Sequence, residues 1–235
     1  MSKKIISNLL NNKLLSLTLS EKDQNIFRKY LSALKLNNSL LVLYLQDIGN
    51  DNIQALLNIL IHNNSIQQLY FSNCDFDGLT FILYYFKLNY YINIHLSILV
   101  SFNLSNMNTL SKLLSYDNSN NIIELFCIIH DENCILENNT INISNIEILD
   151  NSIDFMSNYK LLLILSYIKP LIDTLIKNKL LILHLNFIML YYNKNLLPLL
   201  KNIIQHKYDL SDNIMKRIDI TDNLKFNIPI ENKTI

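Results

Sequence analysis

Apolar residues recur at a fixed spacing along the first third of the chain. In each copy three apolar positions are separated by two residues and then by one, as in Leu14, Leu17 and Leu19, then Leu40, Leu43 and Leu45, then Ile66, Leu69 and Phe71. The middle leucines are 26 positions apart (43 − 17 and 69 − 43). Alternate side chains of a β-strand point to opposite sides. The last two apolar residues of each copy are therefore expected to face a core, and their neighbours to face outward.

Later copies keep the spacing less strictly. Leu96 and Ile98 retain two of the three apolar positions, and the first is taken by Asn93. The complete later copies are Ile122, Leu125 and Cys127; Ile143, Ile146 and Ile148; and Leu180, Leu183 and Leu185. We therefore predict seven strands, at 17–19, 43–45, 69–71, 96–98, 125–127, 146–148 and 183–185.

The segments between these strands show helical periodicity. One apolar stripe follows the i, i+3, i+4, i+7, i+8 pattern of an amphipathic helix and consists of Ile53, Leu56, Leu57, Leu60 and Ile61. Similar stripes begin at Leu110 and at Leu196, and Pro198 would lie in the first turn of the latter helix, where its missing N–H costs little. Two helices, around 154–168 and 171–178, must fit before the last predicted strand.

This combination of features resembles leucine-rich repeat proteins, and the helical return segments look most like the ribonuclease-inhibitor type. The copy that begins at Ile143 continues with Asn151 and Ile153, which gives the full L-x-x-L-x-L-x-x-N-x-L form. The resemblance covers residues 12 to 210 approximately. It implies an α/β fold, a curved solenoid of about seven degenerate repeats with parallel strands on the concave face and helices on the convex face. We predict one domain over residues 1–235, with 211–235 as a C-terminal cap or tail.

Asparagine is abundant throughout the chain, but it does not recur at the position where the repeat family uses it. Ile48, Cys74, Ser101 and His130 stand at that position in other copies. We therefore expect no regular asparagine ladder there, and we assign most asparagines to turns and helix caps.

The charge and cysteine content narrow the classes of partner and compartment. The chain has 20 basic and 20 acidic residues, so its net charge is zero and gives no electrostatic argument for a nucleic-acid or membrane partner. The apolar stretches are shorter than the ~20 residues that span a bilayer, and the N-terminal run is too interrupted for a signal peptide. Three cysteines cannot form a closed set of disulfides, which favours a reducing, cytoplasmic location.

No sequence motif indicates catalysis. The chain lacks a phosphate-binding glycine loop, a G-x-S-x-G turn and an H-E-x-x-H pair. Cys127, His130 and Cys134 have a spacing that suits a metal, but no second Cys/His pair completes four ligands, and Cys127 already fills a core position. We predict a protein that is not an enzyme and has no cofactor, no metal and no small-molecule substrate.

The outward strand positions combine aromatic and hydrogen-bonding side chains with few charges, which is a composition typical of protein interfaces. We predict that another protein binds this concave face. The candidate residues are Tyr44, Gln68, Tyr70, His95, Glu124, Phe126 and His184. The structural alternative is that tyrosine and phenylalanine are present because they suit strands.

A second functional hypothesis is that the chain regulates an enzyme. Some proteins of the family that the chain resembles activate small GTPases, and others inhibit nucleases. An activator that supplies an arginine finger needs a well-presented arginine. The chain offers only Arg28, on a predicted convex helix, and Arg217, near the C-terminus.

Overall fold

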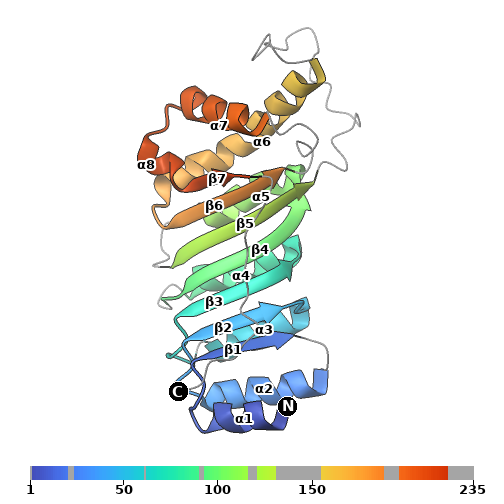
Figure 1. Ribbon diagram of the computed structural model, residues 1–235, viewed down its shortest axis with the longest axis vertical. Helices are drawn as coiled ribbons and strands as arrows, with labels where there is room; N and C mark the ends of the chain where they lie inside the picture. Colours follow the sequence, from blue (N-terminus) through green and yellow to red (C-terminus); the bar gives the residue numbers. More distant parts are fainter. Residues whose placement is uncertain are drawn as a thin grey trace. The chain divides into compact units, whose positions relative to one another are not determined.

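A computed structural model of the protein describes residues 2–20, 24–60, 62–89, 93–115, 121–130, 155–187 and 196–221. These residues form an α/β structure with eight α-helices and seven parallel strands in one sheet, which is not closed into a barrel. The strands follow one another across the sheet in chain order, from β1 to β7 (Figure 1). Within these residues, no helix is both long and apolar enough to cross a membrane.

Six of the seven predicted strands are confirmed, and the strand predicted at 146–148 lies outside the described residues. The confirmed strands are β1 (Ser16–Ser20), β2 (Val42–Gln46), β3 (Gln68–Cys74), β4 (His95–Asn103), β5 (Ile122–His130) and β6 (Leu181–Phe187). A further strand, β7 (Ile218–Ile220), lies where we predicted only a cap or tail, and it pairs in parallel with β6. The sequence pattern did not reveal β7 because this strand is three residues long and has two apolar positions rather than three.

One helix precedes the first strand, and the others occupy the segments between the strands. They are α1 (Ser2–Leu10), α2 (Gln24–Leu36), α3 (Asn50–Leu60), α4 (Phe76–Leu88), α5 (Met107–Leu114), α6 (Phe155–Lys177), α7 (Leu196–Lys207) and α8 (Asp212–Met215), with a 3-10 turn at Leu104–Asn106. Four members of the predicted stripe on α3 are confirmed, because Ile53, Leu56, Leu57 and Leu60 are all buried, and the fifth, Ile61, lies outside the described residues. Pro198 is the third residue of α7, in its first turn as predicted.

The described residues divide into two compact units, and the first comprises residues 2–100 and 121–126. Its strands pair in the register that the sequence period predicts, so that Leu17 pairs with Leu43, Leu43 with Leu69, and Leu69 with Leu96. All four leucines have 0% exposure. The helices α1 to α4 contact one another in order, and α3 and α4 lie behind the strands in Figure 1.

Two buried asparagines join successive repeats of this unit. The side-chain amide of Asn37 donates to the carbonyl of Leu9 in the last turn of α1 (2.7 Å), and that of Asn63 donates to Leu34 in the last turn of α2 (2.9 Å). Asn63 also donates to the carbonyl of Asn37 (2.9 Å). The side-chain oxygen of each accepts from the backbone N–H groups three residues on, at Leu40 and Ile66. An asparagine ladder is therefore present in the loops before the strands, whereas we had considered only the family's position after them.

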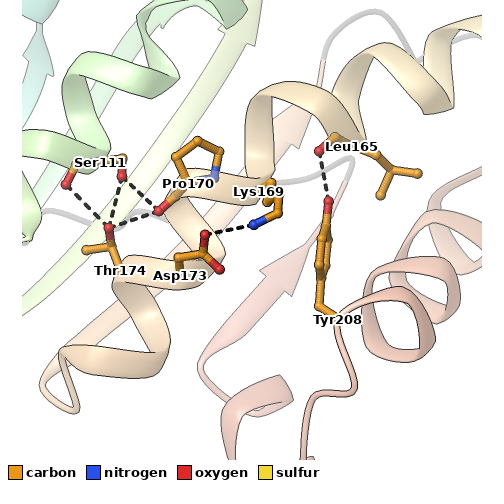
Figure 2. A network of polar contacts seen from close by, with 7 residues as sticks. All are labelled: Ser111, Leu165, Lys169, Pro170, Asp173, Thr174 and Tyr208. Carbon is orange, nitrogen blue, oxygen red and sulfur yellow. Dashed lines mark hydrogen bonds and ion pairs between the residues drawn. The ribbon is translucent and has the colours of Figure 1, made fainter.

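The second unit comprises the remaining described residues, from 101 to 221. Our prediction of two helices around 154–168 and 171–178 is wrong, because α6 is one helix with Pro170 inside it. A proline has no N–H, so the carbonyl of Ser166, four residues earlier in α6, loses its helical donor. Figure 2 shows the hydroxyl groups of Ser111 and Thr174 converging on the Pro170 carbonyl oxygen, at 2.7 and 2.9 Å. The Tyr208 hydroxyl donates to the carbonyl of Leu165 (2.9 Å), which joins the residue after α7 to α6.

The register of the first unit leads to a stability prediction. Leu43 and Leu69 have 0% exposure, which confirms their predicted burial. Leu43→Ala or Leu69→Ala should cost about 2–5 kcal/mol, because apolar contacts are lost and a cavity remains. Urea unfolding would measure this cost, with Gln46→Ala at an exposed position of β2 as the control. A cost below about 1 kcal/mol for both leucine variants would contradict the register.

The asparagine ladder leads to a second prediction. Asn63→Ala removes an amide that is 5% exposed and leaves the carbonyls of Leu34 and Asn37 without this donor. An unsatisfied buried polar group costs about 1–3 kcal/mol, so the loss of unfolding free energy should reach at least about 2 kcal/mol. Asn64→Ala changes the adjacent, exposed asparagine and should be nearly neutral. Equal effects of the two substitutions in urea unfolding would show that the ladder does not stabilise the fold.

Candidate interaction surface on the strands

One row of outward side chains crosses the first unit. Thr18, Tyr44, Tyr70 and Ser97 pair in register along β1 to β4, on the side opposite the core leucines. The rings of Tyr44 and Tyr70 are stacked, with centroids 4.7 Å apart and planes 25° apart. This separation is the ordinary distance between neighbouring strands, so the sheet itself sets the stack. Both tyrosines are partly exposed, and the pair offers an aromatic surface to solvent.

An acidic group continues this row beyond the tyrosines. The Glu124 carboxylate oxygen Oε2 lies 3.2 Å from the Ser97 hydroxyl, which donates to it, and 3.5 Å from the His95 ring nitrogen Nε2. This buried His95 nitrogen has no hydrogen-bond partner among the described residues. The carboxylate is therefore held in place by a hydroxyl and faces an imidazole.

The tyrosine side chains are joined to the polar groups of the same face. The Tyr70 hydroxyl donates to Gln68 Oε1 at 3.4 Å. Burial raises the pKa of Tyr70, and the neighbouring Tyr44 and Glu124 raise it further because a second negative charge there is unfavourable. Burial also raises the pKa of Tyr44. Both phenols therefore stay neutral and keep their hydrogen-bonding capacity at ordinary pH.

Five of the seven candidate residues thus come together in the first unit, with Ser97 between them. We call this set the tyrosine–glutamate cluster; it consists of Tyr44, Gln68, Tyr70, His95, Ser97 and Glu124. Phe126 also belongs to the first unit, but it is only 8% exposed, so it does not form an accessible anchor. Strict alternation along β5 predicted an outward Phe126, whereas Leu125, Phe126 and Cys127 are all buried.

The seventh candidate, His184, belongs to the second unit and has a partner that the sequence did not predict. His184 on β6 pairs in register with Asp219 on β7, and its Nδ1 lies 3.5 Å from the Asp219 carboxylate. Asp219 was missed because residues 211–235 were assigned to a cap or tail. A repeat of the I-x-I alternation at 218–220 was the available signal, and it is too short to stand out.

The cysteines are buried and have raised pKa values. Burial and the neighbouring Asp75 raise the pKa of Cys74 to about 12, and burial raises that of Cys127. Cys134, the third member of the metal candidate, lies outside the described residues. Across the ranges that the structure describes, no three His, Cys, Asp or Glu side chains are grouped so that they could hold a metal ion.

The two arginines lie in different surroundings. Arg28 is exposed on α2. The Arg217 guanidinium donates to the backbone carbonyls of Asn178 (2.8 Å) and Leu181 (3.4 Å), and burial lowers its pKa. Arg217 therefore links β7 to the start of β6.

Comparison of the chain with protein-family models, with curated proteins and with solved structures finds no match. The side chains of the surface are therefore the guide to what it can bind. Two stacked rings provide apolar contact, Gln68 provides a hydrogen-bonding group, and Glu124, held by the buried Ser97 hydroxyl, provides a negative charge. Such a surface suits recognition of another molecule.

The geometry of the cluster predicts a change in the pKa of Tyr70. Because Glu124 raises that pKa, Glu124→Gln should lower it toward the ordinary value of a tyrosine. A titration of the ring signals by NMR would measure the change. Tyr30, whose pKa is raised by burial alone, should not respond.

The sign for stability follows from the same direction. A raised pKa in the folded state means that Tyr70 contributes its full stability below pH 10, and that this contribution is lost as the pH rises through the folded pKa. Because Glu124→Gln lowers the folded-state pKa of Tyr70, the pH range above 10 over which this contribution is lost should end at a lower pH. A pKa of Tyr70 that is unchanged or higher in the variant would contradict the arrangement of the cluster.

Proposed function

We propose that the protein is a non-enzymatic interaction module of the leucine-rich repeat type, which binds another protein through its strand face. The observation that carries the proposal is the stacked, partly exposed Tyr44–Tyr70 pair beside the Glu124 carboxylate. Tyrosine is enriched among the residues that dominate binding energy at interfaces, and hydrogen-bonding neighbours add specificity.

The repeat assignment is supported by the first unit. Its parallel strands pair at the offset of the sequence period, and its buried asparagines repeat at the same 26-residue separation. Units of one strand and one helix cannot bury their apolar faces alone, so they stack. In the proposed curved solenoid the cluster lies on the concave face, and the helices form the convex face.

The location is part of the same proposal. Cys74 and Cys127 are free thiols, and free buried thiols suit a reducing compartment such as the cytoplasm. Their burial and raised pKa values also make them poor nucleophiles, which favours a binding role over a catalytic one.

An enzyme regulator that works through an arginine finger receives less support. Arg217 is held by two backbone carbonyls, and Arg28 stands on α2, away from the strand face. A GTP-hydrolysis assay separates the two classes, because a pure binding module leaves the hydrolysis rate of a candidate GTPase unchanged.

The test of the proposal is an affinity capture from the native cell, followed by measurement of the affinity for the captured partner. Tyr44→Ala and Tyr70→Ala should each weaken binding by about 2 kcal/mol, because truncating a central aromatic anchor removes its desolvated contacts. Gln54→Ala, at an exposed position of α3, should be nearly silent. Circular dichroism checks that each variant is folded.

The opposite pattern would refute the strand face as the interface. If Gln54→Ala abolished binding and both tyrosine variants kept full affinity, the partner would bind the helical side. The description of the fold does not depend on that outcome.

A further inference from the structure

The charge of the strand face indicates what kind of side chain the partner presents. The described strands of the first unit contain no lysine or arginine, and Glu124 is their carboxylate. Asp47, the residue that follows β2, adds a second negative charge and accepts from the Asn73 amide (2.5 Å). A face with acidic groups and no lysine or arginine on its strands is complementary to a cationic partner group.

An aromatic ring and a carboxylate lie close together on this face, and this arrangement favours an arginine over a lysine side chain. Tyr70 pairs in register with Ser97, and the Ser97 hydroxyl contacts Glu124, so the ring and the carboxylate lie on either side of a small residue. Ser97 itself is 1% exposed. A planar guanidinium can stack on a tyrosine ring and at the same time direct N–H groups at a carboxylate, whereas an ammonium is a compact point charge.

We infer that the tyrosine–glutamate cluster binds an arginine side chain of the partner, with the guanidinium against the Tyr70 ring and its N–H groups donated to Glu124. This inference rests on the proposed function and specifies the chemistry of that interface. Gln68 Oε1, which accepts from the Tyr70 hydroxyl, is a further acceptor on the same face. The His95 ring on β4 lies next to the Glu124 carboxylate and bounds the proposed site there.

The test needs no knowledge of the partner. A short peptide with one arginine between glycines, blocked at both ends, is titrated against the full chain and followed by NMR at the Tyr70 ring. The control peptide carries citrulline, which has nearly the same shape and no charge. We expect the arginine peptide to bind about fivefold more tightly, the upper end for a partly exposed charge pair, and its binding to weaken as salt is added.

Two matched variants locate the effect. Glu124→Gln should reduce the affinity of the arginine peptide to that of the citrulline peptide. Asp77→Asn removes one negative charge from an exposed position of α4 and should leave the affinity within about twofold, because distant exposed charges are screened.

Three outcomes would overturn the inference: equal affinities of the two peptides, equal losses from the two variants, or no shift of the Tyr70 ring at millimolar peptide. Each of these outcomes leaves the proposed function to its own test. A partner captured by the wild type and lost in Tyr44→Ala and Tyr70→Ala would still show binding at the strand face, through contacts other than arginine.

Discussion

In-register stacking of parallel strands at a 26-residue offset is the constraint on which the first unit depends. The offset places Leu17, Leu43 and Leu69 beside one another in the core, and all three are fully buried. The same offset places Tyr44 beside Tyr70 on the other side of the sheet. The stacked ring pair is thus the outward counterpart of the leucine row, since one register fixes both.

The outward row changes its chemistry at the fourth strand. Tyr44 and Tyr70 occupy this outward position on β2 and β3. The same position on β4 is the small Ser97, whose hydroxyl donates to Glu124. The aromatic run therefore ends beside a carboxylate. A perfectly regular repeat would place a third tyrosine at position 97 and offer apolar contact alone. The departure from the repeat therefore leaves the Glu124 carboxylate beside the aromatic rings.

Sequence reasoning captured what the period controls and missed what lies outside it. The six confirmed strands and the stripe of α3 follow from apolar spacing, because burial of those residues is what the spacing encodes. Strand β7 and the pairing of Asp219 with His184 involve a three-residue strand, which is shorter than any pattern that spacing can reveal. The burial of Phe126 depends on which groups cover β5, and alternation along a single strand carries no information on that.

The asparagine contacts to buried backbone groups in the first unit depend on its regular period. Where the period holds, one asparagine side chain per repeat, at Asn37 and Asn63, can reach both a preceding helix and the loop before the following strand. The long interval that contains α6 has no such regular neighbour. Hydroxyl groups from Ser111, Thr174 and Tyr208 supply donors there instead (Figure 2). A hydroxyl needs only one nearby acceptor and no fixed repeat length, so such contacts also occur in the first unit, as between the Ser39 hydroxyl and the Leu14 carbonyl. The asparagine contacts need two neighbours at once, and only a constant repeat length places both within reach of each amide.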